Sequence, residues 1–243
     1  MTIDVRGIVL GTVRHSDRND ITSIYTRERG RLAVATPAGG GRTARMKRAS
    51  LMPLSLVEAT LSGSAGGEIW RLSHLSLSSP WRDLYSDPVK MSVGMFVAEF
   101  LGKLVRDAGP DARQWDYVVS SLKLLDAESN RLSVANFPVI LLSSLAAFAG
   151  IMPDVSGWPA SRVFDMRAGQ YVGGEPGHPD TLRGDAAGAV RLLSRLTFAS
   201  GSRLRLSRVE RQEILGQLLR YYSIHLPGVA GMKSPAILRD VLG

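Results

Sequence analysis

The sequence contains no cysteine among its 243 residues. Disulfide bonds, thiolate nucleophiles and cysteine-ligated zinc are therefore excluded, and the absence fits a reducing cytosol. The 4 histidines are scattered and lack the HExxH spacing of a zinc protease, and no Gly-x-Ser-x-Gly nucleophile elbow occurs. We therefore expect a cytoplasmic protein that binds partners without a cofactor or metal and is not an enzyme.

Acidic residues are scarce at the N-terminal end. Residues 1–50 hold ten Lys or Arg but only four Asp or Glu, a net charge of +6 out of +8 for the whole chain. A positive field segregated in this way attracts polyanions. Nucleic acid is the favoured partner, an acidic membrane surface is the lesser alternative, and a solvated basic surface without a partner is the third.

One uncharged run, residues 133–152, is long enough to be compared with a membrane span. Asn136 and Pro138 are typical of a helix start, and Gly150 followed by Pro153 is typical of a stop. A helix of about 13 residues would be about 20 Å long, shorter than a hydrocarbon core of about 30 Å. We expect the buried central helix of a helical bundle.

Residues 1–80 predict strands. Alternating or β-branched runs are separated by turn residues, with Gly30 in a hairpin position. The expected strands are 5–13, 21–26, 31–35, 54–61 and 69–75. Five short strands at this spacing favour a small closed barrel, and five is the strand count of the OB-fold.

After Pro80 the hydrophobic period becomes helical. The expected helices cover 89–104, 115–125, the uncharged run, 186–198, a long helix from Ser207 with a Ser207/Glu210 capping box, and 235–242. Residues 153–188 are rich in Gly and Pro and contain a predicted hairpin, 163–172, that turns at Ala168 and Gly169. The fold class is therefore α+β: an OB-fold β-barrel domain, 1–80, followed by an all-α helical domain, 81–243, with a loop-rich insert at about 153–188.

The basic residues of the predicted barrel are the best candidates for a nucleic-acid site. Three glycines, 39–41, precede a cluster of cations between the third and fourth strands. The candidate DNA-binding residues are Arg14, Arg29 and Arg31 from the strands and turns, with Arg42, Arg45, Lys47 and Arg48 from this loop. Tyr25 and Trp70 are the only aromatic residues of the first 79, and either could belong to the core. We therefore expect phosphate contacts to dominate, with steep salt dependence and weak sequence preference.

The helical domain offers a second set of cations, beside an apolar helix face. Arg208, Arg211 and Arg220 lie on the long helix, and Lys233 follows the next loop. Cations along an apolar groove can receive an acidic, hydrophobic peptide tail. An ordinary solvated helix face is the alternative interpretation of each arginine.

Segments along nearly the whole chain resemble the RecO family of bacterial DNA repair proteins. They are RGIVL at 6–10, IYT at 24–26, GR at 30–31, PLSLVE at 53–58, FVAEFL at 96–101, FDMRAG at 164–169, RYYSIHLPG at 220–228 and KS at 233–234. The YYxxHLPG block with its following Lys-Ser pair is the most specific. The departure is the insert, where many relatives have a four-cysteine zinc site and this sequence has no cysteine.

The resemblance implies a recombination mediator that binds single- and double-stranded DNA, anneals complementary strands and is associated with the nucleoid. Its implied partners are RecR, the acidic C-terminal tail of single-stranded DNA-binding protein and, indirectly, RecA. Two alternatives remain at this point: a protein-interaction adaptor with incidental nucleic-acid affinity, and an RNA-binding OB protein.

Overall fold

The computed structural model describes residues 1–17, 19–38, 50–64, 67–158 and 163–242. The chain separates into two compact units, Met1–Ala127 and Glu128–Gly243. The boundary expected at residue 80 marks the change from strands to helices, and it stays a prediction for the division into domains. By compactness the first two helices belong with the barrel, so each unit is described with its own elements.

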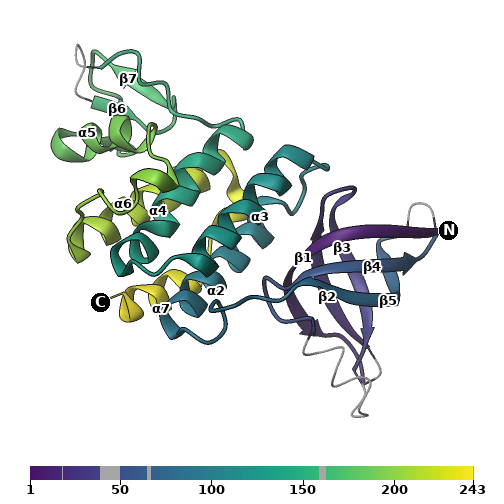
Figure 1. Ribbon diagram of the computed structural model, residues 1–243. Helices are drawn as coiled ribbons and strands as arrows, with labels where there is room; N and C mark the ends of the chain where they lie inside the picture. Colours follow the sequence, from purple (N-terminus) through teal and green to yellow (C-terminus); the bar gives the residue numbers. More distant parts are fainter. Residues whose placement is uncertain (18, 39–49, 65–66, 159–162, 243) are drawn as a thin grey trace. The chain divides into compact units, whose positions relative to one another are not determined.

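The first unit contains a closed five-stranded barrel (Figure 1). Its strands are β1 (Thr2–Arg14), β2 (Asn19–Thr26), β3 (Gly30–Pro37), β4 (Leu56–Ser62) and β5 (Ile69–Ser79). The order around the barrel is β1-β2-β3-β5-β4, and β4 pairs back onto β1. Only β3 and β5 among these neighbours run parallel. This barrel, followed by helices α2 to α7, confirms the predicted fold class.

The barrel interior is built from alternate residues of each strand, as the two-residue period of a β-strand requires. Val9, Ile24, Val34 and Leu61 are fully buried there. Gly7 is needed because a Cβ at this position would lie 2.3 Å from the Cγ2 of Ile24. The core therefore explains why the strands can be recognised from their hydrophobic pattern.

Two helices complete the first unit, α2 (Pro88–Leu104) and α3 (Ala112–Ala127). The side chain of Asp87 accepts hydrogen bonds from the first free backbone N–H groups of α2, and Pro88 stands at its first position. Asp126, near the end of α3, accepts backbone N–H bonds from three consecutive residues of the segment that leads from β5 to α2. These donors are Arg82, Asp83 and Leu84, at 2.9, 2.8 and 2.7 Å.

The second unit begins with α4 (Arg131–Phe148), which corrects the predicted helix start. The helix begins about two turns before Pro138, because the Asn130 side chain caps the N–H groups of Leu132 and Ser133. Pro138 lies inside the helix. By length and composition α4 could cross a membrane, yet 67% of its 18-residue window is buried inside the fold. This burial agrees with the expected core helix.

The insert forms a three-stranded sheet of order β7-β6-β8. Its strands are β6 (Val163–Asp165), β7 (Gln170–Val172) and β8 (Thr181–Leu182). The predicted hairpin is present, and Gly169 supplies its turn with a φ of +68°. β8 was not predicted from the sequence, because a strand of two residues is too short to show an alternating hydrophobic pattern.

Three more helices follow: α5 (Gly184–Leu193), α6 (Arg208–His225) and α7 (Ser234–Val241), with single 3-10 turns at Phe198–Ser200 and Pro227–Val229. The Ser207/Glu210 capping box is present at the start of α6, as predicted. Helix α5 ends at Leu193, earlier than expected. A separate 3-10 turn, with its own capping box between Thr197 and Ser200, follows it.

Candidate nucleic-acid interface

The outer face of β1, β2, β3 and β5 carries mostly small and aliphatic side chains in cross-strand rows. Strand pairing defines two of these rows, because residues that pair across strands point to the same side of a sheet. They are Val13–Ile21–Ala35–Arg71 and Gly11–Ser23–Ala33–Ile69. We call this surface the barrel face. It is open to solvent, since Val13 is 66% exposed and Ile69 47% exposed.

Two arginines, Arg31 and Arg71, lie on the barrel face, and a third, Arg14, ends the adjoining strand β1. Arg14 directly follows Val13, so strand alternation points its side chain to the opposite side of the sheet at the end of β1. The side chain is 71% exposed, and its ion pair among the described residues is a long one, 3.6 Å to Asp17. Arg71 stands on β5 beside Ala35. Arg31 lies on β3, four residues and hence about 13 Å from Ala35. Arg31 and Arg71 therefore flank an aliphatic surface, and Arg14 adds an exposed cation at the end of the adjoining strand.

Arg31 is held in place. Its Nη2 donates to Ser23 Oγ at 3.0 Å, while its buried Nε has no hydrogen-bond partner among the described residues. Arg71 was missed by sequence reasoning. The available signal was the alternation of β5, in which Trp70 and Leu72 pack against the barrel core, so that Arg71 faces outward.

The other sequence-predicted cations are placed differently or lie outside the described residues. Arg29 is exposed in the turn between β2 and β3, at the opposite end of β2 from Arg14. The loop cations Arg42, Arg45, Lys47 and Arg48 lie outside the described residues.

Two further arginines of the basic N-terminal segment are paired with carboxylates. Arg27 forms a bidentate pair with Asp116 of α3, at 2.8 and 2.9 Å, and Arg6 pairs with Glu28 at 3.1 Å. The hydrogen bond from Arg27 lowers the pKa of Asp116 and raises that of Arg27. The net charge of +6 is thus not all available to an anion.

Carboxylates gather on a different part of the barrel. Asp4, Glu28 and Glu58 line a groove of about 370 Å³ over β1, β4 and β5, together with Arg6 and His74. A polyanion is disfavoured beside three carboxylates and favoured beside free guanidinium groups. The charge distribution therefore favours the barrel face over this groove for a phosphate chain.

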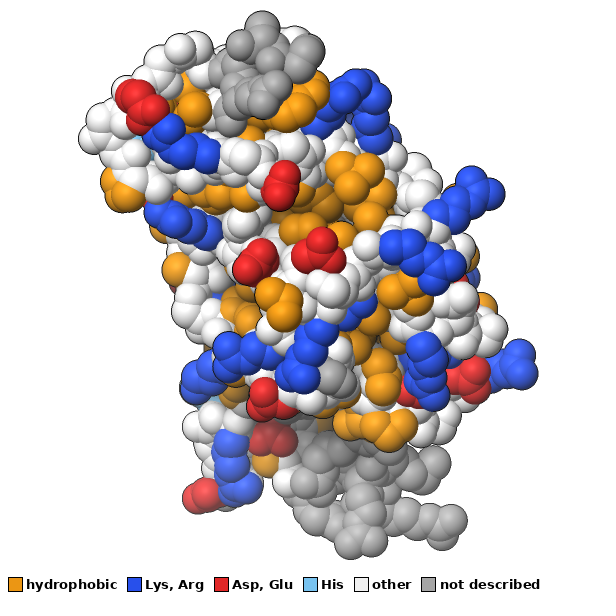
Figure 2. Space-filling view, turned by 90° about the vertical axis from the view of Figure 1, so that its left-hand side faces the viewer, with side chains coloured by type: hydrophobic (Ala, Val, Ile, Leu, Met, Phe, Trp, Pro, Cys, Tyr) orange, Lys and Arg blue, Asp and Glu red, His pale blue; other side chains and the backbone are white. Residues whose placement is uncertain are grey.

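The second unit contains a groove of about 410 Å³ between α6 and α7, which we call the α6–α7 groove. Leu215, Leu219 and Leu238 contribute to its apolar lining, and Arg208 and Arg239 are among its charged lining residues. Figure 2 shows one face of the chain, on which hydrophobic side chains lie open between Lys and Arg side chains. Apolar surface beside cations fits an acidic, hydrophobic peptide.

Arg211 also lines the α6–α7 groove but is only 9% exposed. Its Nε donates to Asn136 Oδ1 at 3.0 Å, and its Nη2 donates to the carbonyl oxygen of Leu206 at 3.1 Å. Burial lowers its pKa. Within the described part of the chain no carboxylate lies within ion-pair distance of it, so the buried charge lacks a counter-ion.

The remaining predicted tail-binding residues are not among the groove's lining residues. Arg220 donates to Asp180 Oδ1 of the insert at 2.5 Å, and Arg167 binds the other oxygen of Asp180 at 2.7 Å. Lys233 stands directly before α7. The structure thus brings Arg208 and Arg211 together and leaves Arg220 in an ion-pair network.

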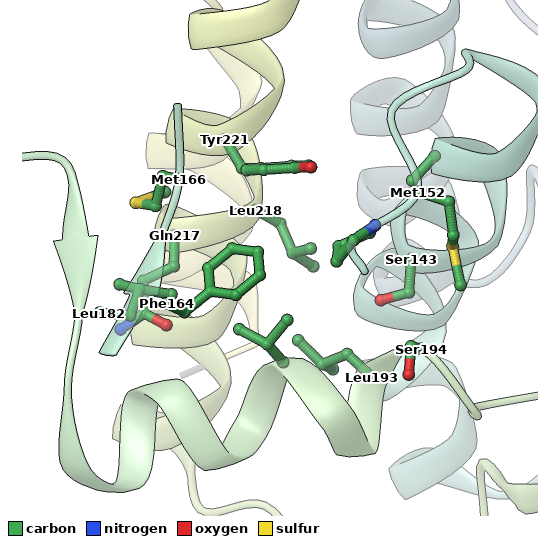
Figure 3. A pocket seen from close by; sticks show the side chains of 13 residues that line it. Ser143, Met152, Phe164, Met166, Leu182, Leu193, Ser194, Gln217, Leu218 and Tyr221 are labelled. Carbon is green, nitrogen blue, oxygen red and sulfur yellow. The ribbon is translucent and has the colours of Figure 1, made fainter. Parts of the chain in front are cut away.

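A second, tighter cavity of about 40 Å³ lies among α4, the insert, α5 and α6. In Figure 3 the ring of Phe164 points into the cavity, with Leu193 of α5 on one side and Leu218 and Tyr221 of α6 on the other. A volume of this size holds at most one or a few water molecules. It is a packing gap in an apolar core.

The insert is the segment in which the sequence departs from the four-cysteine zinc site of many RecO-like proteins. The sequence has no cysteine. Among the described residues no group of three His, Cys, Asp or Glu could hold a metal. The ring of Phe164 instead packs against Tyr171 of the same hairpin and against Tyr221 of α6. The ring centroids of Tyr171 and Tyr221 lie 5.2 and 6.1 Å from that of Phe164.

Comparison with known proteins gives one consistent result. Residues 1–81 match the family model for the recombination protein O N terminal region, and residues 85–235 match the model for its C terminal region. A protein named DNA repair protein RecO from Phocaeicola vulgatus is 31% identical over 235 residues, covering 97% of both chains. Proteins with the same name from Porphyromonas gingivalis and Flavobacterium psychrophilum are 31% and 25% identical, covering 98% and 99% of both chains. With both family models matched in order and relatives similar along their full length, the chain belongs to the RecO family.

Proposed function

We propose that this chain acts in DNA repair and recombination, which its membership in the RecO family supports. In this proposal it binds single- and double-stranded DNA, anneals complementary strands and, with RecR, helps to load RecA onto DNA coated by single-stranded DNA-binding protein. The observation that carries the DNA-binding part is the barrel face, where Arg31 and Arg71 border an open aliphatic surface and Arg14 ends the adjoining strand.

The physical basis is counter-ion release. Each phosphate neutralised by an arginine on a single strand releases condensed cations, so the logarithm of the binding constant falls with the logarithm of salt concentration by about 0.7 per phosphate. Arg31, Arg71 and Arg14 together therefore account for a slope of about 2 if each contacts one phosphate. The loop cations predicted from the sequence would add to this slope.

The test is fluorescence anisotropy with a labelled single-stranded oligonucleotide over a salt series. The triple variant R14A/R31A/R71A is expected to bind more weakly at low salt and to have a shallower slope. A matched control, R106A/R113A/K123A, removes the same charge from exposed positions in and before α3 of the same unit. Equal slopes for the two triple variants would contradict the proposed site.

The α6–α7 groove is the proposed site for the acidic C-terminal tail of single-stranded DNA-binding protein. The uncompensated charge of Arg211 and the apolar lining support it, since a carboxylate beside a buried guanidinium gains a charge-assisted bond. Titration with the tail peptide should show weaker binding for R208A/R239A than for wild type, with R220A as the arginine control outside the groove.

The same groove keeps one alternative open, a protein-interaction adaptor with incidental nucleic-acid affinity. Both experiments together decide between the two. Peptide binding that depends on Arg208 and Arg239, combined with negligible DNA binding at physiological salt, would favour the adaptor. DNA binding that depends on the barrel face favours the repair mediator.

A further inference from the structure

The barrel has no aromatic side chain with which to stack a base. Tyr25 and Trp70 are the only Phe, Tyr or Trp residues in positions 1–80. The Tyr25 side chain is 1% exposed, and burial raises its pKa. Its backbone carbonyl oxygen accepts a hydrogen bond from the indole N–H of Trp115 at 3.1 Å, so α3 packs on this end of β2.

Trp70 is half-buried, with its ring turned toward the barrel core. Its ring packs against the barrel core, and it lies so close to Gly63 that a Cβ there would be 2.9 Å from its Cε3. The loop residues that lie outside the described part, 39–49 and 65–66, contain no Phe, Tyr or Trp in the sequence either. The barrel face therefore presents Ile69, Ala33, Ala35 and Val13 where OB-fold proteins that hold single strands commonly present aromatic rings.

This surface distinguishes two ways of holding a strand. Stacking on an aromatic ring strengthens binding by at least about fivefold per base and occupies the face of that base. Arginines that contact phosphates contribute through charge alone and leave the bases unengaged. Arg14, Arg31 and Arg71 belong to the second mode, and nothing on the described barrel face belongs to the first.

From this we infer that the barrel face binds the sugar–phosphate chain of a single strand and leaves its bases unstacked and free to pair with a second strand. The inference rests on the proposed DNA binding and deepens it. It names the recognised group as a chain of regularly spaced phosphates, with or without bases. It also gives a physical reason for annealing, since a strand held in this way remains a template for its complement.

The test compares the full chain on two oligonucleotides of equal length, an oligothymidylate and an abasic chain in which every nucleotide is a tetrahydrofuran phosphate. The two affinities are expected to agree within about threefold, with equal salt slopes. A loss of tenfold or more on removing the bases would overturn the inference. Failure of both oligonucleotides to bind would instead overturn the proposed function, so the two failures are distinguishable.

A gain-of-function variant tests whether the strand crosses this face. Ile69→Trp places an aromatic ring at an exposed position at the end of a row, beside Ala33, and Ile69→Val keeps a β-branched aliphatic side chain. The tryptophan variant is expected to prefer oligothymidylate over the abasic chain by at least about fivefold. It should also anneal complementary strands more slowly than wild type, whereas the valine variant should match wild type. Absence of any base preference in Ile69→Trp would contradict the inferred path of the strand.

Discussion

Arg211 and Asn136 form a buried hydrogen-bonded pair, with the Nε of the arginine 3.0 Å from the Oδ1 of the amide. The amide nitrogen of Asn136 donates in turn to the carbonyl oxygens of Gly201 and Leu204, at 3.1 and 2.8 Å. One fully buried asparagine on α4 thereby joins α6 to the segment that precedes it. The pair fixes the direction of the only strongly buried arginine in the described lining of the α6–α7 groove.

Replacing Asn136 by leucine should therefore destabilise the second unit. The substitution removes three hydrogen bonds and leaves the guanidinium of Arg211 and two buried carbonyl groups short of partners. The expected cost is about 2–4 kcal/mol in the free energy of unfolding. Urea denaturation measures it, with the exposed substitution Ser129→Ala as control. A loss below about 0.5 kcal/mol, the usual size of a surface effect, would contradict the role assigned to Asn136.

The buried pair also illustrates which parts of this protein can be predicted from sequence. The strands and most helices follow from local periodicity, and Ser207 with Glu210 correctly marks the start of α6. The surroundings of an arginine depend on distant residues. Arg211 was predicted to be a tail-binding surface residue, yet its partner Asn136 is 75 residues away in the sequence.

The start of α4 shows a second kind of limit. Pro138 is typical of a first turn, but Asn130 provides the cap and lies outside the uncharged run that drew attention to this helix. Arg71 was missed for a third reason. The alternation of β5 indicates that Arg71 faces outward, but its place beside Ala35 follows from the pairing between β3 and β5, which is a long-range property.

The hydrogen bonds between Asp126 of α3 and the segment that leads from β5 to α2 give the next prediction. Asp126 accepts backbone N–H bonds from Arg82, Asp83 and Leu84, and its own carbonyl oxygen accepts the Nζ of Lys90 at 2.6 Å. An amide in place of the carboxylate has a single oxygen acceptor, so Asp126→Asn loses at least one of the three bonds.

We expect Asp126→Asn to lower the free energy of unfolding of the chain by about 1–3 kcal/mol. Thermal and urea denaturation measure the change, with Asp107→Asn as a matched exposed control. Hydrogen exchange should also show faster exchange at residues 82–84 in the variant. Unchanged protection of these three amides would be inconsistent with the role of the Asp126 carboxylate as their hydrogen-bond acceptor.

The ion pairs of the insert predict a pH dependence. Hydrogen bonds from Arg167 and Arg220 hold the pKa of Asp180 below its ordinary value of 3.8. A carboxyl whose pKa is depressed by folding stabilises the folded state above its unfolded pKa, and this contribution is lost as the pH falls through the folded pKa. Asp180→Asn should therefore destabilise the insert at pH 7 and should differ little from wild type at a pH well below 3.8.

Limited proteolysis and hydrogen exchange of residues 163–182, at neutral and acidic pH, measure this difference. Asp154→Asn is a useful comparison, because Asp154 receives its hydrogen bonds from Ser156 and has no arginine partner in the described ion pairs. A variant effect of Asp180→Asn that stays constant across this pH range would exclude the two-arginine pairing as its cause.

The insert should also be indifferent to metal removal. Its apolar core consists of Phe164, Met166 and Tyr171 against Tyr221, and the sequence offers no cysteine ligand for zinc. Adding a chelator should leave the midpoint of thermal unfolding unchanged within error. A drop of several degrees on chelation would show that a metal contributes to this fold.

In contrast to metal removal, truncation of this apolar core should destabilise the insert. Phe164 is 1% exposed, so Phe164→Ala removes a fully buried ring and is expected to cost about 3–5 kcal/mol. The loss should appear first as increased exchange in the β6–β7 hairpin, because Phe164 makes its ring contacts with Tyr171 and Tyr221. Affinity for single-stranded DNA should stay within about twofold of wild type under conditions where the variant remains folded, since the proposed barrel face lies in the other unit. A parallel loss of DNA affinity in folded Phe164→Ala protein would mean that the insert, and not the barrel face alone, contributes to binding.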